Sequence, residues 1–133
     1  MNLSGSINRV VLMVLAAVLL GGCGVARSAP PTPITSMSQI EGKWRGTITI
    51  GFGGPEELYY LTIRPDGSLV AQWGMNWQWG NVTLSGGGAS FNMSGGVAGT
   101  SSGTLTYSPG PGGRSLALNP TFGNWSANVT PLE

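Results

Sequence analysis

Four carboxylates precede the end of the chain and could act as acids or bases: Glu41, Glu56, Glu57 and Asp66. A hydrolase that uses paired carboxylates needs two of them about 5–9 Å apart on facing elements. Glu56 and Glu57 are adjacent in the chain, so on a strand they point to opposite faces and cannot share a proton. Asp66 lies in Pro65-Asp66-Gly67, where a turn explains its side chain. The carboxylates therefore predict no active site.

Nucleophilic catalysis and metal binding also lack their usual residues. The chain contains no histidine, which is the commonest general base and a frequent zinc ligand. Lys43 is the remaining base for the many serines, but it alternates with apolar positions and is expected to face solvent. The glycine-rich stretch Gly51–Pro55 lacks the Gly-Lys-Ser/Thr of a phosphate-binding loop. We therefore predict that the protein is not an enzyme and holds no metal and no cofactor.

The charge balance argues against a nucleic-acid partner. The chain has six basic and five acidic side chains, and loss of Arg9 with an N-terminal segment would leave it near neutral. Affinity for a phosphate backbone depends on clustered Lys and Arg side chains that displace counterions. No such basic stripe is present, so we predict that the protein does not bind nucleic acid.

The single cysteine, Cys23, follows an apolar run and two small residues. Arg9 precedes Val10–Leu20, a run as long as the apolar region of a signal peptide and shorter than the about 20 residues that span a bilayer. Leu20-Gly21-Gly22-Cys23 resembles the lipobox of bacterial lipoproteins. A cysteine thiolate is nucleophilic enough to be alkylated by a diacylglyceryl donor near neutral pH. The alternatives are a buried structural cysteine and an uncleaved helix.

This resemblance implies a lipid-anchored protein of the cell envelope. Residues 1–22 would be a signal peptide that is removed, and Cys23 would become the first residue, acylated with chains such as palmitate. Two or three acyl chains hold a protein on a membrane durably, so the membrane is the expected partner through Cys23. Gly24 in place of an Asp resembles the outer-membrane class of Gram-negative lipoproteins. In another cell type the protein would lie on the outer face of the cell membrane.

The rest of the chain divides into a tether and a folded domain. Val25–Ser38 contains three prolines, and proline-rich stretches favour extended, hydrated conformations. We therefore predict a tether over residues 23–40 and an all-β domain over residues 41–133. Because Cys23 is the single cysteine, this domain would contain no disulfide.

Alternating apolar and polar residues predict about eight strands in the domain. The 23 glycines of the chain argue against helices, and the pattern lacks any helical segment between strands. The expected strands are Lys43–Ile50, Glu57–Arg64, Leu69–Trp73, Asn76–Leu84, Ala89–Met93, Gly103–Tyr107, Ser115–Leu118 and Asn124–Val129. In the fourth strand Trp77 and Trp79 are odd-numbered, whereas Val82 and Leu84 are even-numbered. We therefore expect a β-bulge at Gly80 that resets the facing.

Eight short antiparallel strands hide their edges most completely in a small barrel, and a two-sheet β-sandwich is the alternative. The interior of such a barrel is filled by side chains or holds one small ligand. Gly42-Lys43-Trp44 resembles the Gly-x-Trp motif of lipocalins and related calycin barrels. The resemblance implies that Trp44 closes one end of the barrel.

Three tryptophans, Trp73, Trp77 and Trp79, fall within seven residues and could bind a ligand. An indole ring offers a flat apolar face that stacks on sugars or small aromatics. By its position in the alternation Trp73 belongs to the core, whereas Trp77 and Trp79 either fill the core or line the barrel mouth. We predict that Trp77 and Trp79 bind a small apolar or sugar-like ligand. The alternative is a structural protein, or an inhibitor, that presents a polar sheet face to an envelope protein.

Overall fold

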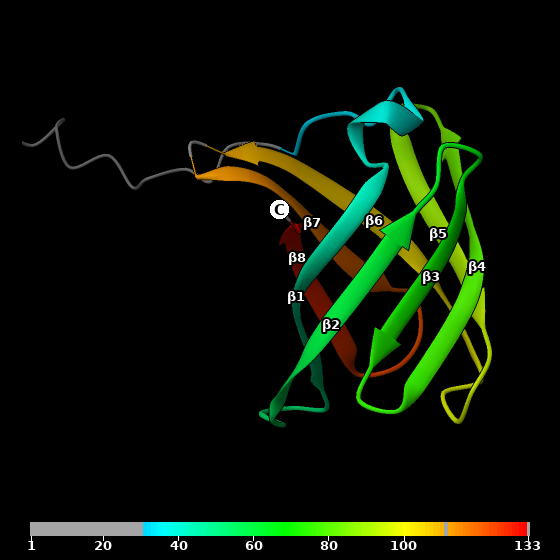
Figure 1. Ribbon diagram of the computed structural model, residues 1–133, viewed down its shortest axis with the longest axis vertical. Coiled ribbons are helices and arrows are strands. Elements are labelled where there is room, and N and C mark those ends of the chain that lie inside the picture. Colours follow the sequence, from blue (N-terminus) through cyan, green and yellow to red (C-terminus); the bar gives the residue numbers. More distant parts are fainter. Residues whose placement is uncertain (1–30, 111, 133) are drawn as a thin grey trace, which may run out of the picture. The chain divides into compact units, whose positions relative to one another are not determined.

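The computed structural model describes residues 31–110 and 112–132, which form an all-β unit (Figure 1). Its strands are β1 (Gly42–Ile50), β2 (Glu56–Ile63), β3 (Ser68–Trp73), β4 (Asn76–Ser85), β5 (Gly88–Ser94), β6 (Thr100–Gly110), β7 (Gly113–Pro120) and β8 (Trp125–Pro131). Each strand pairs antiparallel with the next, and β8 pairs with β1. The sheet therefore closes into a barrel. The predicted eight-stranded antiparallel barrel is confirmed, and the sandwich alternative is wrong.

The period-two pattern of the sequence explains which side chains fill the barrel. Along β5 the residues Ala89, Phe91 and Met93 are buried, and the residues between them are exposed. β3 repeats the pattern, with Leu69, Ala71 and Trp73 facing inward. A strand places successive side chains on opposite faces, so this alternation lets each strand bury an apolar face and keep a polar face in water.

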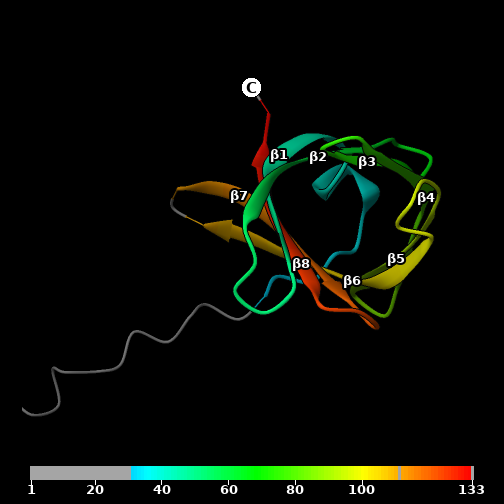
Figure 2. The ribbon, with the colours of Figure 1, turned by 90° about the horizontal axis from the view of Figure 1, so that it is seen from below.

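One end of the barrel is covered by the segment that precedes β1. The short 3₁₀ helix η1 (Met37–Gln39) lies across this end and is visible through the ring of strands in Figure 2. Ile40 follows it and is fully buried. The indole nitrogen of Trp44 donates a hydrogen bond of 2.9 Å to the carbonyl oxygen of Ile40. Arg114 of β7 lies over the Trp44 ring, with its guanidinium carbon 5.3 Å from the ring centroid.

The folded unit begins at Pro31 and not at residue 41. Thr32 donates a backbone hydrogen bond of 3.1 Å to the carbonyl of Tyr107, and Ile34 is 2% exposed. Ser36 and Gln39 form a capping box that fixes the start of η1. The predicted tether over residues 23–40 is therefore too long, because its last ten residues pack on the barrel. All core residues and all strand pairings of the unit lie within residues 31–132.

Glycines allow neighbouring strands to approach closely inside the barrel. A Cβ atom on Gly80 would collide with the backbone carbonyl oxygen of Asn92, and Gly46 and Gly103 are crowded in the same way. Gly80 stays in regular register, opposite Leu69 on one side and Met93 on the other. The predicted bulge at Gly80 is wrong: this glycine serves close packing, where a side chain would not fit.

Among the described residues no helix is long and apolar enough to cross a membrane. The predicted signal peptide over residues 1–22 and the predicted acylation site Cys23 lie outside the described residues.

Candidate functional site

The barrel end opposite η1 is open and is surrounded by four loops. These loops join β1 to β2, β3 to β4, β5 to β6, and β7 to β8, and they lie together at the lower end of the barrel in Figure 1. A cavity of about 490 Å³ enters the barrel from this end. We call it the open-end cavity. Its volume is in the range of sites that bind small molecules, about 300–1,000 Å³.

The open-end cavity is lined mainly by apolar side chains. They come from four strands and two loops: Ile48, Ile50, Tyr59, Trp73, Val97, Ala98, Phe122 and Trp125. Their packing fixes the shape of the cavity, since the rings of Tyr59 and Trp73 lie with their centroids 5.8 Å apart. No Lys, Arg, Asp or Glu is among the lining residues. A buried charge without a partner is strongly unfavourable, so this lining suits a neutral molecule.

Tyr59, one of the lining residues, carries a buried hydroxyl group. Its side chain is fully buried, and its hydroxyl oxygen has no hydrogen-bond partner among the described residues. Burial raises the pKa of the Tyr59 phenol well above its ordinary value of 10, so the hydroxyl keeps its proton at neutral pH. It can donate one hydrogen bond and accept another. Buried polar groups in native proteins are nearly always hydrogen-bonded, so a buried hydroxyl without a hydrogen bond is unusual.

Gln78 supplies a second polar group at the cavity, from the inner face of β4. It is 1% exposed. Its Nε2 atom donates to the carbonyl oxygen of Gly99 and to Oγ of Ser101, each at 3.1 Å. These bonds tie the loop between β5 and β6 to β4 and fix the amide plane. The amide oxygen Oε1 is the atom of this side chain that remains to accept a hydrogen bond from a ligand.

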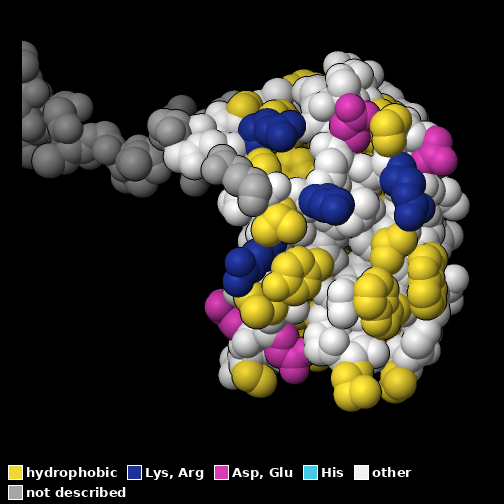
Figure 3. Space-filling view, viewed as in Figure 1, with side chains coloured by type: hydrophobic (Ala, Val, Ile, Leu, Met, Phe, Trp, Pro, Cys, Tyr) yellow, Lys and Arg dark blue, Asp and Glu magenta, His cyan; other side chains and the backbone are white. Residues whose placement is uncertain are grey.

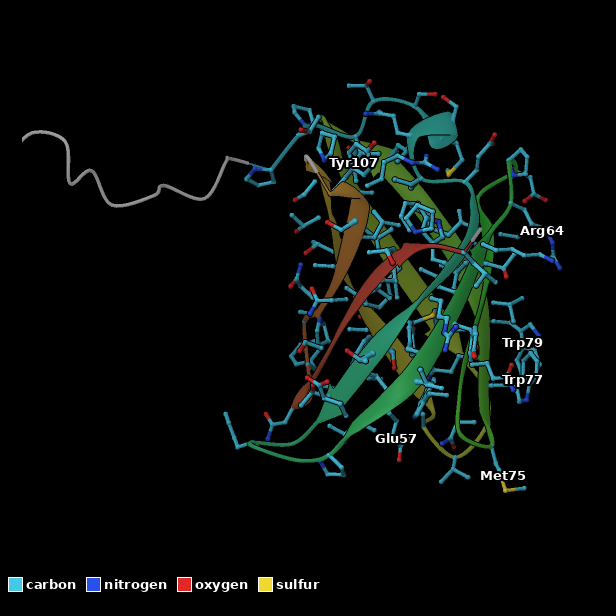
Figure 4. All side chains as sticks on the ribbon, turned by 60° about the vertical axis from the view of Figure 1, so that its left-hand side comes forward. Glu57, Arg64, Met75, Trp77, Trp79 and Tyr107 are labelled. Carbon is cyan, nitrogen blue, oxygen red and sulfur yellow. The ribbon has the colours of Figure 1, made fainter. Side chains whose placement is uncertain are left out.

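Trp77 and Trp79 lie together, as predicted, but on the outside of the barrel. Figure 4 shows both indoles projecting outward from β4, and they are 43% and 54% exposed. Neither residue lines the open-end cavity. The even-numbered Gln78 between them faces inward, so the two tryptophans must face out. The expectation that they line the barrel mouth or fill the core is therefore wrong. Trp73 does belong to the interior, as predicted.

Three of the four carboxylates considered in the sequence are exposed at the surface. Glu56 and Glu57 are both exposed at the start of β2. Asp66 accepts hydrogen bonds from the backbone N–H and the hydroxyl of Ser68, at 2.9 Å and 2.7 Å. These bonds lower the pKa of the Asp66 carboxyl below its ordinary value, which agrees with its predicted role in the turn. Among the described residues no three Asp, Glu, Cys or His side chains gather as metal ligands would.

A second hollow, of about 450 Å³, lies on the outer surface beside the N-terminal segment. Its lining includes Pro33, Gly87 and Thr104. No buried side-chain atom there lacks a hydrogen-bond partner, since the one such atom found in the described residues is the Tyr59 hydroxyl. The open-end cavity is therefore the stronger candidate for a binding site.

Fold and cavity together define a small antiparallel β-barrel, covered at one end, with a neutral and mainly apolar site at the other. Comparisons with protein-family models, with curated proteins and with solved structures find no match for this chain. The open-end cavity and its lining residues are therefore the basis for inferring a function.

Proposed function

We propose that this chain is a lipid-anchored, non-enzymatic protein of the cell envelope that binds a small, neutral, mainly apolar ligand in the open-end cavity. The observation that carries the binding proposal is the buried hydroxyl of Tyr59, which has no hydrogen-bond partner in residues 31–110 and 112–132. Leaving such a group unpaired costs about 1–3 kcal/mol. A ligand with one hydrogen-bonding group would remove this cost, and its apolar part would contact Trp73 and Trp125.

The cavity lining favours an apolar ligand over a sugar. A sugar carries a hydroxyl on most of its carbons, and each one needs a partner when it is buried. The polar side chains of the lining are few: Tyr59, Asn76, Gln78, Thr100 and Ser101. Gln78 and Ser101 are already bonded to each other. This supply suits one or two polar groups on a ligand.

The location rests on the sequence Leu20-Gly21-Gly22-Cys23 and the apolar run before it. Acylation of Cys23 would place the barrel at the outer membrane of a Gram-negative cell, or on the outer face of the cell membrane otherwise. With the barrel beginning at Pro31, seven residues would separate the acylated cysteine from the folded unit.

Binding is tested with a pair of probes that differ by one hydroxyl, naphthalene and 2-naphthol. Each displaces the fluorescent probe N-phenyl-1-naphthylamine from the protein. We expect 2-naphthol to bind more tightly than naphthalene, and Tyr59→Phe to reduce this preference about tenfold. Tyr60→Phe is the matched control, because Tyr60 is the next residue and faces outward, 38% exposed. If neither probe binds, or if both variants behave alike, the proposed site is wrong.

The anchor is tested separately in cells. The full chain should incorporate labelled palmitate, and Cys23→Ser should abolish both labelling and cleavage. A Cys23→Ser chain that is labelled, or that matures as the unaltered chain does, would exclude the lipoprotein proposal.

A further inference from the structure

Each of the four loops at the open end carries one large apolar side chain that is almost fully exposed. They are Phe52 (95% exposed), Met75 (97%), Val97 (96%) and Phe122 (82%). We call these four residues the apolar rim. Single exposed apolar side chains are common, but here four of them are concentrated around one opening.

The covered end of the barrel has a different composition. The turn between β2 and β3 is Arg64-Pro65-Asp66-Gly67, and the turn between β4 and β5 is Gly86-Gly87. In Figure 3 hydrophobic side chains stand at the lower tips of the barrel, whereas no Lys or Arg does. The two ends of the barrel therefore differ in the residue types that they expose.

The apolar rim continues into the open-end cavity. Val97 and Phe122 belong to the rim and also line the cavity. An apolar molecule that entered between the rim loops would thus pass from one apolar surface to another. This continuous apolar surface favours apolar surroundings at the open end, from which the ligand would enter the cavity.

Aromatic side chains lie beside the rim on the outer face of the barrel. Trp77 and Trp79 project from the first residues of β4, which follow Met75, as Figure 4 shows. Tryptophan is enriched where a protein crosses the boundary between lipid headgroups and acyl chains, since its ring is apolar and its N–H is polar. The two exposed indoles thus stand where a bilayer that received the rim would have its headgroups.

The charges indicate which kind of lipid surface fits. None of the four rim loops contains a Lys or Arg, and Glu56 and Glu57 follow the loop that carries Phe52. Anionic lipids attract basic segments and repel carboxylates. The rim therefore fits a zwitterionic bilayer and gains nothing from anionic lipid.

We infer that the apolar rim inserts into the surface of a zwitterionic phospholipid bilayer, so that the open-end cavity opens to the lipid and takes its ligand from it. This inference deepens the proposed function and rests on it. The anchor permits this placement: Cys23 and Pro31 are eight residues apart, which reaches about 28 Å when extended. This reach exceeds the length of the barrel, since the nine residues of β1 extend about 23 Å along the axis of a barrel with ordinary strand tilt.

The test uses residues 31–133 without the anchor, because this unit contains its whole core and every strand pairing. We expect it to sediment with phosphatidylcholine vesicles and to bind no better when phosphatidylglycerol is added. Phe52→Ser and Phe122→Ser should each lower the partition coefficient about tenfold. Leu132→Ser is the matched control: Leu132 is 44% exposed and follows β8 at the covered end.

Depth is measured with phosphatidylcholine brominated on its acyl chains. Bromine should quench part of the tryptophan emission of the unaltered unit, and the quenched part should fall in Trp77→Phe and Trp79→Phe. The inference is overturned if the unit does not sediment with phosphatidylcholine, if it sediments only with anionic vesicles, or if Leu132→Ser weakens sedimentation as much as the rim variants. The naphthalene and 2-naphthol titrations show separately whether the cavity binds, so failure of membrane insertion can be distinguished from failure of ligand binding.

Discussion

Replacing Tyr59 by Phe should make the ligand-free protein more stable while weakening its binding. The Tyr59 side chain is fully buried, and its hydroxyl has no hydrogen-bond partner among the described residues. An unpaired buried hydroxyl costs about 1–3 kcal/mol. Phe keeps the ring and its contact with Trp73, whose centroid lies 5.8 Å away. We therefore expect the free energy of unfolding to rise by about 1–2 kcal/mol.

Urea and thermal unfolding measure this change. For a domain of about 100 residues, 1 kcal/mol corresponds to about 4–8 °C in the midpoint temperature. Tyr60→Phe, on the outer face, should stay within about 0.5 kcal/mol of the unaltered protein. A loss of 1 kcal/mol or more in Tyr59→Phe would refute the reasoning, because it would mean that an ordered water already satisfies the hydroxyl.

The same residue predicts a dependence on alkaline pH. The pKa of Tyr59 is raised by burial in the folded state, whereas in the unfolded state it is near 10. Above pH 10 the unfolded chain releases this proton first, so stability is complete below about pH 10 and declines as the pH rises further. Tyr59→Phe should lack this part of the decline, which unfolding measured between pH 9 and about pH 11 would show.

Three further predictions concern the framework of the barrel. Gly80→Ala should cost about 3 kcal/mol or prevent folding, because the new Cβ would collide with backbone; Gly112→Ala, in open space, should cost less than about 0.5 kcal/mol in the same urea titration. Trp44→Phe should cost about 1–3 kcal/mol by leaving the carbonyl of Ile40 unpaired at the covered end, as thermal unfolding would show. Asp66 has a lowered pKa when folded, so its contribution to stability is present above its ordinary value of 3.8 and is lost as the pH falls through the folded pKa. Asp66→Asn should therefore lose less stability than the unaltered protein between about pH 5 and pH 2.

The strands could be predicted because each one buries a single face. In β5 the alternation of Ala89, Phe91 and Met93 with exposed residues is unbroken, and glycine turns bound it on both sides. All eight predicted strands exist, with ends that differ by a few residues. Barrel closure followed from the cost of unpaired edges, which is a general physical argument and needs no signal in the sequence.

The facing of the first half of β4 is predicted wrongly, whereas Val82 faces inward as predicted. Trp77 and Trp79 are the largest apolar residues of the strand, and this favours the core or the barrel mouth for them. The inner position between them is held by Gln78, which is buried because Gly99 and Ser101 accept its hydrogen bonds. The signal was present in the even-numbered Val82, since continuing its parity toward the start of the strand puts Gln78 inside.

The N-terminal boundary was misplaced for a related reason. Prolines before residue 34 indicate an extended tether, but Thr32 pairs with Tyr107, and Ile34 and Ile40 are buried against the barrel. Two signals marked the packing. Ser36 and Gln39 have the spacing of a capping box, and two isoleucines six residues apart would be unusual in a hydrated linker.

The open-end cavity could not be predicted, because its lining comes from strands and loops at both ends of the chain. Ile48 and Trp125 are 77 positions apart in sequence and become neighbours in its lining when β8 pairs with β1. The alternation of Tyr59 with Leu61 and Ile63 puts Tyr59 on the apolar face of its strand, but an inward tyrosine is ordinarily a core residue. What makes it a candidate ligand contact is the missing partner of its hydroxyl, and that is a property of the three-dimensional surroundings alone.

The proposed function places stability and binding at different ends of the barrel. At the covered end Trp44 and Ile40 are buried and joined by a hydrogen bond, so the contacts at this end stabilise the fold. At the open end Phe52 and Met75 contribute exposed apolar surface that the fold itself does not need. Tyr59 lines the open-end cavity and is packed as a core residue, yet its hydroxyl has no partner in the part of the chain that the structure describes. Phe at this position would stabilise the unbound protein, and the proposed ligand gives the Tyr59 hydroxyl a hydrogen-bonding role that Phe does not provide.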